Sequence, residues 1–211
     1  MHLTWLGQAC FKIQGKDVTI ITDPFDQKIG LKLPRLQANI VTVSHDHYDH
    51  NNIEAVKGDP FVITQLGEYE IKKVFIRGIS SWHDDKQGAE RGRNIIYTFN
   101  FEDIKIVHLG DLGAKLDDEQ LDKIEDVDIL LIPVGGIYTL NGKQAAELVN
   151  EIEPRIVVPM HYKIPDLKEK LNSLDAFCNE MGVKNYNAEE KLKISKRDLP
   201  ADETKVVVLK V

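Results

Sequence analysis

The stretch TVSHDHYDHNN (residues 42–52) places three of the chain's 7 histidines close together with two aspartates. The apolar residues before the histidines, in NIVTVS, predict a buried strand. Side chains alternate along an extended chain, so His45 and His47 point the same way. Asp49 and His50 follow where NNIEAV predicts the first turn of a helix. Four groups that can bind a metal therefore converge at the end of one strand.

Three further side chains that follow predicted strands extend this cluster. His83 comes after KKVFIRGI, Asp111 comes after IKIVH, and His161 comes after RIVV. Layered sheet folds gather their functional groups on the loops beyond strand ends. Five imidazoles and two carboxylates can hold two divalent metals, with a bridging carboxylate and a water or hydroxide between them. Nitrogen and oxygen ligands without cysteine suit zinc, manganese, iron or nickel.

Composition bounds the class of protein. With 211 residues, 42% of them hydrophobic and 29% charged, residues 1–211 are expected to form a single globular domain. No apolar run approaches the ~20 residues that span a bilayer, and no signal peptide is expected. Cys10 and Cys178 are far apart, which favours reduced thiols in a cytoplasmic protein. The net charge of −7 argues against nucleic-acid binding, and the sequence leaves monomer and homo-oligomer open.

The order of predicted elements indicates a layered α/β fold. Short β-branched and aromatic runs fill the first half, beginning with LTWLG, CFKIQ and VTIITDP. The second half alternates buried strands with helices over DDEQLDKI and NGKQAAELVNEI. A long helix is expected over residues 164–182 and a last strand over 204–211. Asn51 is expected to cap the helix after the histidine cluster. Strands followed by strand–helix alternation place sheets inside and helices outside.

The order of these motifs resembles the metallo-β-lactamase superfamily. The run His45-x-His47-x-Asp49-His50, then His83, Asp111 and His161, carries the likeness, and it covers essentially the whole chain. HLGDLG, LLIPVGGIYTL and VPMHYK further resemble a compact branch of small metal-dependent hydrolases related to ascorbate-phosphate lactonase-like proteins. The resemblance implies a four-layer αββα sandwich with two metals at one edge of the sheets.

The resemblance also implies a role for each ligand. One metal would take His45, His47 and His83, and the other would take Asp49, His50 and His161. Asp111 would bridge the two, and a bridging hydroxide would attack the substrate with Asp49 and Asp111 as the catalytic carboxylates. Asp23, in ITDPF, would support the ligand loop from behind. Relatives often have histidine where this chain has Gln8, and the inserted domain of RNA-processing members is missing here.

Simpler interpretations exist for several of these residues. The histidine cluster can be a polar loop, and Asp84 can replace His83 as a ligand. Asp111 can cap a helix, although Gly110 before it indicates a backbone pressed close to a neighbour. His161 can be a hydrogen-bonded core residue, and for His108 that interpretation is preferred because it lies within a strand.

Contacts to the substrate are predicted from three rim positions. The charged segment DDKQGAERGRN (84–94) can cover the site, and Arg91 or Arg93 in it can hold a phosphate or carboxylate. Tyr138 or Thr139, in GGIYT, can donate a hydrogen bond to a developing oxyanion, and Lys163 is a further rim cation. A solvated hairpin tip and a glycine turn are the alternatives.

The favoured function is hydrolysis of a small ester or phosphodiester by a dinuclear metal centre, with zinc first among the metals. A lactone or thioester is the alternative substrate. A metal-binding module without turnover is the alternative class, against which the complete ligand set argues. Redox chemistry at two irons is a third hypothesis. Its superfamily members carry an acidic residue where this chain has His47, and they are usually fused to an electron-carrier domain.

Overall fold

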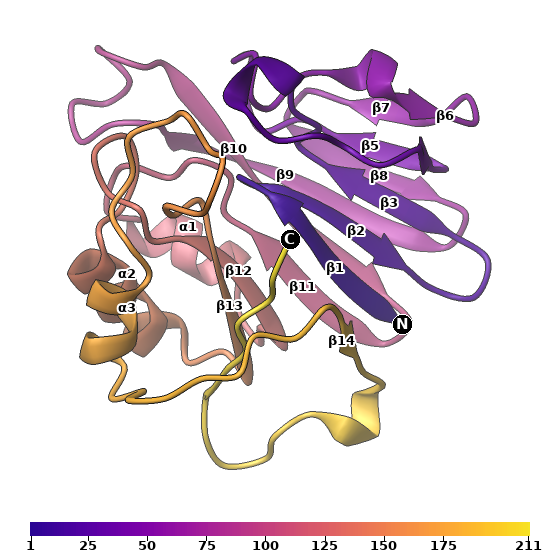
Figure 1. The fold of residues 1–211 in the computed structure, drawn as a ribbon. Helices are drawn as coiled ribbons and strands as arrows, with labels where there is room; N and C mark the ends of the chain where they lie inside the picture. Colours follow the sequence, from indigo (N-terminus) through magenta and orange to yellow (C-terminus); the bar gives the residue numbers. More distant parts are fainter.

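The computed structural model describes all residues from 1 to 211 and is built around two β-sheets (Figure 1). The first sheet has 6 strands in the order β14-β1-β2-β3-β5-β7. They are β1 (His2–Gly7), β2 (Cys10–Gln14), β3 (Thr19–Thr22), β5 (Ile40–Thr42), β7 (Phe61–Ile63) and β14 (Leu192–Lys193). β1, β2 and β3 pair as an antiparallel meander, whereas β3, β5 and β7 run parallel.

The second sheet has 7 strands in the order β15-β13-β12-β11-β10-β9-β8. They are β8 (Gly67–Ile71), β9 (Val74–Trp82), β10 (Arg93–Phe101), β11 (Ile104–His108), β12 (Ile129–Pro133), β13 (Ile156–Met160) and β15 (Lys205–Val206). β8 to β11 pair antiparallel, and β11, β12, β13 and β15 run parallel. β12 and β13 are buried along their whole length, as is typical of parallel strands covered on both faces.

Helices α1 (Asp118–Lys123), α2 (Gly142–Ile152) and α3 (Asp175–Glu180) lie together beside the second sheet (Figure 1). α2 begins at a capping box in which Asn141 and Gln144 each accept a backbone N–H of the other, and it buries Leu148 and Val149. α1 begins at an equivalent box. The longest helix, α2, has 11 residues, and none has the length and apolar character needed to cross a membrane.

Two apolar cores hold the layers together. The larger, with 48 buried residues, combines the inner faces of both sheets with the apolar sides of the helices. The smaller, with 11 buried residues, lies on the outer face of the first sheet. It is covered by 3-10 turns η1 (Gln27–Ile29) and η2 (Ile53–Ala55) and by the ribbon of β4 (Leu36–Gln37) and β6 (Val56–Lys57). The α/β sandwich is confirmed, with irregular segments and 3-10 turns in place of α-helices on this outer face.

The helix expected over residues 164–182 is largely wrong, because only α3 forms there. The N–H of Lys168 donates to the carbonyl of Ile29, and the N–H of Asn172 donates to that of Gly135. These tertiary partners take the place of intrahelical bonds. The segment also reaches the ligand loop, since the Tyr48 hydroxyl donates to Glu169 at 2.5 Å.

Other boundaries also differ from expectation. The helix expected after His50 is the 3-10 turn η2, and its N-cap is Asn52, not Asn51, whose side-chain amide donates to Asp46. The last strand is shorter than expected, with β15 at Lys205–Val206 and one bridge at Leu209. Elements β4, β6, β8, β14, η1 and η3 (Lys196–Asp198) were not predicted from the sequence. β8, with sequence GEYEI, is a largely exposed edge strand and lacks a buried face to detect.

Candidate metal centre

Every residue of the candidate centre follows the carboxyl end of a strand. In the first sheet, Gln8 follows β1, Asp23 follows β3 and the histidine loop follows β5. In the second sheet, His83, Asp111 and His161 follow β9, β11 and β13. Within each sheet these strands run in one direction, so their ends meet at one edge. Open α/β sheets place their ligands in the crevice beyond such ends.

Three groups of side chains form there, each with three ligand atoms within 4.8 Å of one another; one of them, Asp23 with His45 and His50, takes its two histidines from the other two groups, which are here called the first and second clusters. The first cluster consists of His45, His47 and His83. The second cluster consists of Asp49, His50 and His161. The first and second clusters therefore contain the same two sets of three residues that the family resemblance implies for two metals.

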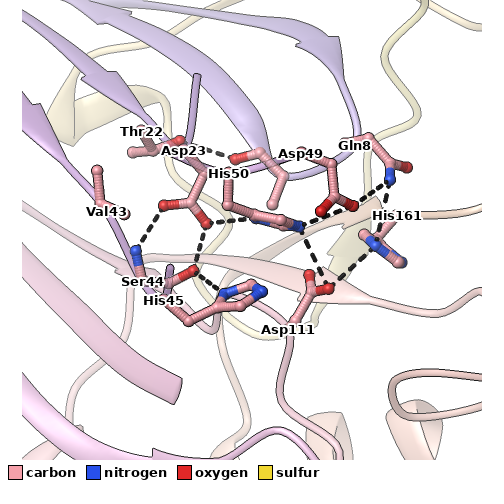
Figure 2. Close-up of polar contacts among 12 residues, drawn as sticks. Gln8, Thr22, Asp23, Val43, Ser44, His45, Asp49, His50, Asp111 and His161 are labelled. Carbon is pink, nitrogen blue, oxygen red and sulfur yellow. Dashed lines mark hydrogen bonds and ion pairs between the residues drawn. The ribbon is translucent and has the colours of Figure 1, made fainter. Parts of the chain in front are cut away.

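Asp111 lies between the clusters and contacts both. Its Oδ2 is 3.5 Å from Nε2 of His83 in the first cluster. The same oxygen is 3.3 Å from Nε2 of His50 and 3.1 Å from Nε2 of His161 in the second (Figure 2). Its Oδ1 is buried without a hydrogen-bond partner. A carboxylate with one oxygen aimed at two sets of nitrogens has the placement of a bridging ligand.

Outer hydrogen bonds fix the orientation of the imidazoles. Asp23, fully buried, accepts from the Ser44 hydroxyl at 2.5 Å and from Nδ1 of His50 at 3.0 Å (Figure 2). The Ser44 hydroxyl in turn lies 2.9 Å from Nδ1 of His45. In the same way Nδ1 of His83 donates to the carbonyl of Tyr138 at 3.1 Å. These bonds fix the orientation of each ring, and in His45 and His83 they hold the Nδ1 proton, so that Nε2 faces the centre with its lone pair free.

Several buried polar atoms of the centre have no hydrogen-bond partner, which indicates that the centre binds a metal ion. Nε2 of His45 and of His50 and Oδ1 of Asp111 are buried and have no hydrogen-bond partner. Buried polar groups are nearly always paired in native proteins. The set contains only imidazole nitrogen and carboxylate oxygen, and these donors fit zinc or another borderline divalent metal.

Electrostatics keeps most of these groups in the form that binds a metal. Although burial opposes it, the imidazoles of His161 and His50 hold the pKa of Asp111 well below its usual range. Burial, with His50 close by, holds the pKa of His45 well below its usual range, and burial also lowers the pKa of His83. His50 differs, because Asp111 and Asp49 outweigh its burial and raise its pKa well above the usual range.

Backbone strain is concentrated at the same edge. Gln8, Asp23 and His161 have φ of 49°, 40° and 52°, in the left-handed region that residues other than glycine rarely adopt. Such a conformation costs of order 1–3 kcal/mol and persists only where the surroundings enforce it. Here the carbonyl of Gln8 accepts from the Trp5 indole at 2.8 Å and from the His161 N–H at 3.2 Å.

Two supporting side chains were not predicted, and the role of Gln8 was left open. Nε2 of Gln8 donates to Asp49 at 3.1 Å, while its Oε1 is buried and unpartnered. Asn94, fully buried in β10, accepts the Asp111 N–H at 2.9 Å through its side-chain amide oxygen and thereby fixes the backbone that carries Asp111. The Ser44 hydroxyl lies between Asp23 and His45 and forms hydrogen bonds with both. Proximity to the motif could have identified Ser44, whereas nothing in the sequence distinguishes Asn94 from an ordinary strand residue.

The alternatives for neighbouring residues are now decided. Both oxygens of Asp84 accept backbone N–H groups of the next loop, so Asp84 does not replace His83. His108 is the expected core histidine, because its Nε2 donates to the carbonyl of Ala9 at 2.8 Å. Gly110 lies as close to its neighbours as expected, since an added Cβ would be 2.3 Å from Oδ1 of Asn94.

The predicted substrate contacts lie in different places. A cavity of about 480 Å³ opens over the ligands and is lined by Tyr138 and Arg91. Arg93 lines a neighbouring cavity of about 480 Å³. Lys163 is exposed and lines neither cavity. Tyr138 and Arg91 therefore share a cavity with ligands of both clusters, Arg93 shares one with His45 and His47, and Lys163 lies apart.

Comparison with known proteins agrees with this geometry. A family model described as the beta-lactamase superfamily domain matches residues 2–161. A crystal structure from Thermotoga maritima, described as a Zn-dependent hydrolase of the metallo-beta-lactamase superfamily, is 36% identical with a TM-score of 0.81. The match covers 99% of this chain and 97% of that one.

Relatives known from sequence carry a similar description. A UPF0173 metal-dependent hydrolase of Thermococcus onnurineus is 30% identical over 190 residues, which is 77% of this chain and 84% of the relative. Another, of Methanopyrus kandleri, is 24% identical over 87% of this chain and 94% of the relative. The chain therefore belongs to the metallo-β-lactamase superfamily. Within it, the chain is a metal-dependent hydrolase, as the sequence predicted.

Proposed function

We propose that the chain is a dinuclear hydrolase in which each cluster holds one divalent ion and Asp111 bridges the two. The observation that carries this proposal is the pair of three-atom clusters, each within 4.8 Å, on either side of one carboxylate. The unpartnered Nε2 atoms of His45 and His50 support it, because they belong to different clusters. Zinc is the proposed metal, in line with the donor set and with the description of the Thermotoga relative.

The proposed reaction is cleavage of a small ester or phosphodiester. Two divalent ions would polarise a substrate oxygen and make hydroxide available from water near neutral pH. Among the protein's own groups, Oδ1 of Asp111 is placed to accept a proton inside the centre, because no hydrogen bond occupies it. Gln8 steadies Asp49 through its amide at 3.1 Å. The cavity of about 480 Å³ fits a small molecule, and residues 1–211 are proposed to act as one cytoplasmic domain.

Metal analysis of matched variants tests this proposal. Wild type should bind about two metals per chain, and His47→Ala and His161→Ala should each retain about one, since each removes a ligand from a different cluster. His2→Ala is the control, because His2 is exposed on β1 and should leave both ions in place. Unchanged metal content in both ligand variants would show that the ligand assignment is wrong.

Turnover then separates an enzyme from a binding module. Metal-loaded protein should hydrolyse a p-nitrophenyl ester or bis-p-nitrophenyl phosphate, and both ligand variants should lose at least ~100-fold in kcat/KM. Two bound metals without turnover of an ester, phosphodiester, lactone or thioester would instead favour a module without catalysis.

A further inference from the structure

Two cavities of about 480 Å³ each meet at the candidate centre. One lies over the ligands and includes Asp111 and His161. The other, here called the side cavity, extends from His45 to the β7–β8 connection and the start of β10. Asp46, His47 and Arg91 line both cavities. The side cavity therefore adjoins the ligand face, and the two share one wall.

The only permanently positive side chains of the side cavity are Arg91 and Arg93. Arg93 is exposed, its guanidinium lies 6.0 Å from the ring centre of Trp82, and no carboxylate pairs with it. Arg91 lies 5.3 Å over the ring of Tyr138 and has only a 3.5 Å contact with its neighbour Glu90. Both guanidiniums rest on aromatic rings and retain free N–H donors, the arrangement that suits a carboxylate or phosphate.

The loop that carries Arg91 is held in place from inside. Both oxygens of Asp84, which is 3% exposed, accept backbone N–H groups at 2.7–3.0 Å, including that of Arg91 itself. These hydrogen bonds to a buried carboxylate argue against the alternative that the loop is a solvated hairpin tip. Because the loop is ordered beforehand, less conformational entropy is lost when Arg91 engages a ligand.

We propose that the substrate carries a second oxyanion, a carboxylate or a phosphate, remote from the bond that is cleaved. This group binds in the side cavity between Arg91 and Arg93 while the scissile bond lies over the ligands. The inference rests on the proposed function and specifies its substrate class. Asp46 borders both cavities and opposes a second negative charge near His47, so the oxyanion belongs at the Arg93 end.

Matched substrates test this assignment. The p-nitrophenyl esters of pentanoic acid, of glutaric acid and of 3-phosphonopropanoic acid offer no charge, a carboxylate and a phosphonate beyond the same scissile bond. Wild type should favour one of the charged esters, and Arg93→Gln should reduce the ratio of charged to uncharged kcat/KM by about 10- to 100-fold. Arg93→Lys should restore part of this ratio, because lysine keeps the positive charge but lacks the two-pronged hydrogen bonding of the guanidinium. Arg77→Gln, on β9 and paired with Glu68, is the arginine control.

Trp82 gives a second readout that needs no turnover. Phosphate or acetate titrated into the metal-loaded protein should change its fluorescence, because Trp82 lies under Arg93 whereas Trp5 is buried elsewhere. Arg93→Gln should raise the anion concentration at the midpoint of the titration by about 10-fold or more. Trp82→Phe should remove the fluorescence change.

Each outcome bears on one proposal. An unchanged ester ratio in Arg93→Gln would overturn the oxyanion site and leave the hydrolase proposal intact. Absence of all ester turnover would count against the proposed ester reaction, and the Trp82 titration would then decide the oxyanion site by itself. A midpoint that Arg93→Gln does not alter would overturn it.

Discussion

Replacing Asp23 with asparagine should weaken both clusters at once, although Asp23 belongs to neither. The carboxylate supports His50 of the second cluster directly and His45 of the first through Ser44. In the asparagine variant Oδ1 can still accept the Ser44 N–H, now at 2.8 Å. The new NH₂ group would replace Oδ2 and would face the Ser44 hydroxyl and Nδ1 of His50, which both donate to Oδ2 in the wild type. An NH₂ group cannot accept either hydrogen bond.

The size of the effect follows from these contacts. Two hydrogen bonds to a charged acceptor are lost, each worth about 1.5–3 kcal/mol, so the upper limit is about 6 kcal/mol. Because they share one oxygen they are not additive, and we expect a loss of about 3–4 kcal/mol in the free energy of unfolding. Outer partners of ligating histidines typically account for 10- to 100-fold in metal affinity.

Chelator competition and urea unfolding measure the two effects. Asp23→Asn should weaken both metal sites about 10- to 100-fold. Ser44→Ala is the matched control, since it removes the relay to His45 and leaves the 3.0 Å bond from His50 to Asp23 in place. It should therefore weaken one site only. Equal metal affinities in wild type and Asp23→Asn would show that Asp23 does not support the two clusters.

Three further predictions concern the surroundings of the centre. Gly110→Ala should cost about 2 kcal/mol or more in urea unfolding, because Gly110 has φ of +57° and an added Cβ would meet Asn94 at 2.3 Å; an unchanged midpoint would contradict this. Burial raises the pKa of the Cys10 and Cys178 thiols, so a thiol reagent should label neither before unfolding, and fast labelling of folded protein would count against the described core. Although burial opposes it, the backbone N–H groups of the following loop lower the pKa of Asp84. Asp84 therefore stabilises the loop fully above the unfolded pKa of about 3.9 and loses this effect as the pH falls through the lower folded pKa. At neutral pH Asp84→Asn should speed tryptic cleavage in the loop, and equal cleavage rates would contradict the anchoring role.

The ligand residues could be predicted because four of them lie in one short loop and each of the other three directly follows a predicted strand. His45 to His50 lie within one loop, and alternation along an extended chain already aims His45 and His47 together. His83, Asp111 and His161 each follow an apolar run that had to be a buried strand. Periodicity therefore located the ends of the strands, and a parallel arrangement gathered those ends.

Features that depend on tertiary partners could not be predicted. The segment before α3 contains helix-forming residues, yet its N–H groups bond to Ile29 and Gly135, which are far away in sequence. Local propensity carries no information about such partners. In the sequence Asn94 looks like any other strand residue, and only the fold shows that its side-chain amide oxygen accepts the Asp111 N–H. The side cavity likewise exists only where the start of β10 meets the β7–β8 connection.

The most direct test of the central claim is a crystal structure of zinc-loaded protein with anomalous data collected on both sides of the zinc absorption edge. We expect two anomalous peaks, one beside His45, His47 and His83 and one beside Asp49, His50 and His161. They should lie about 3.5–4 Å apart, with Asp111 contacting both. One peak, or peaks away from these residues, would contradict the dinuclear centre.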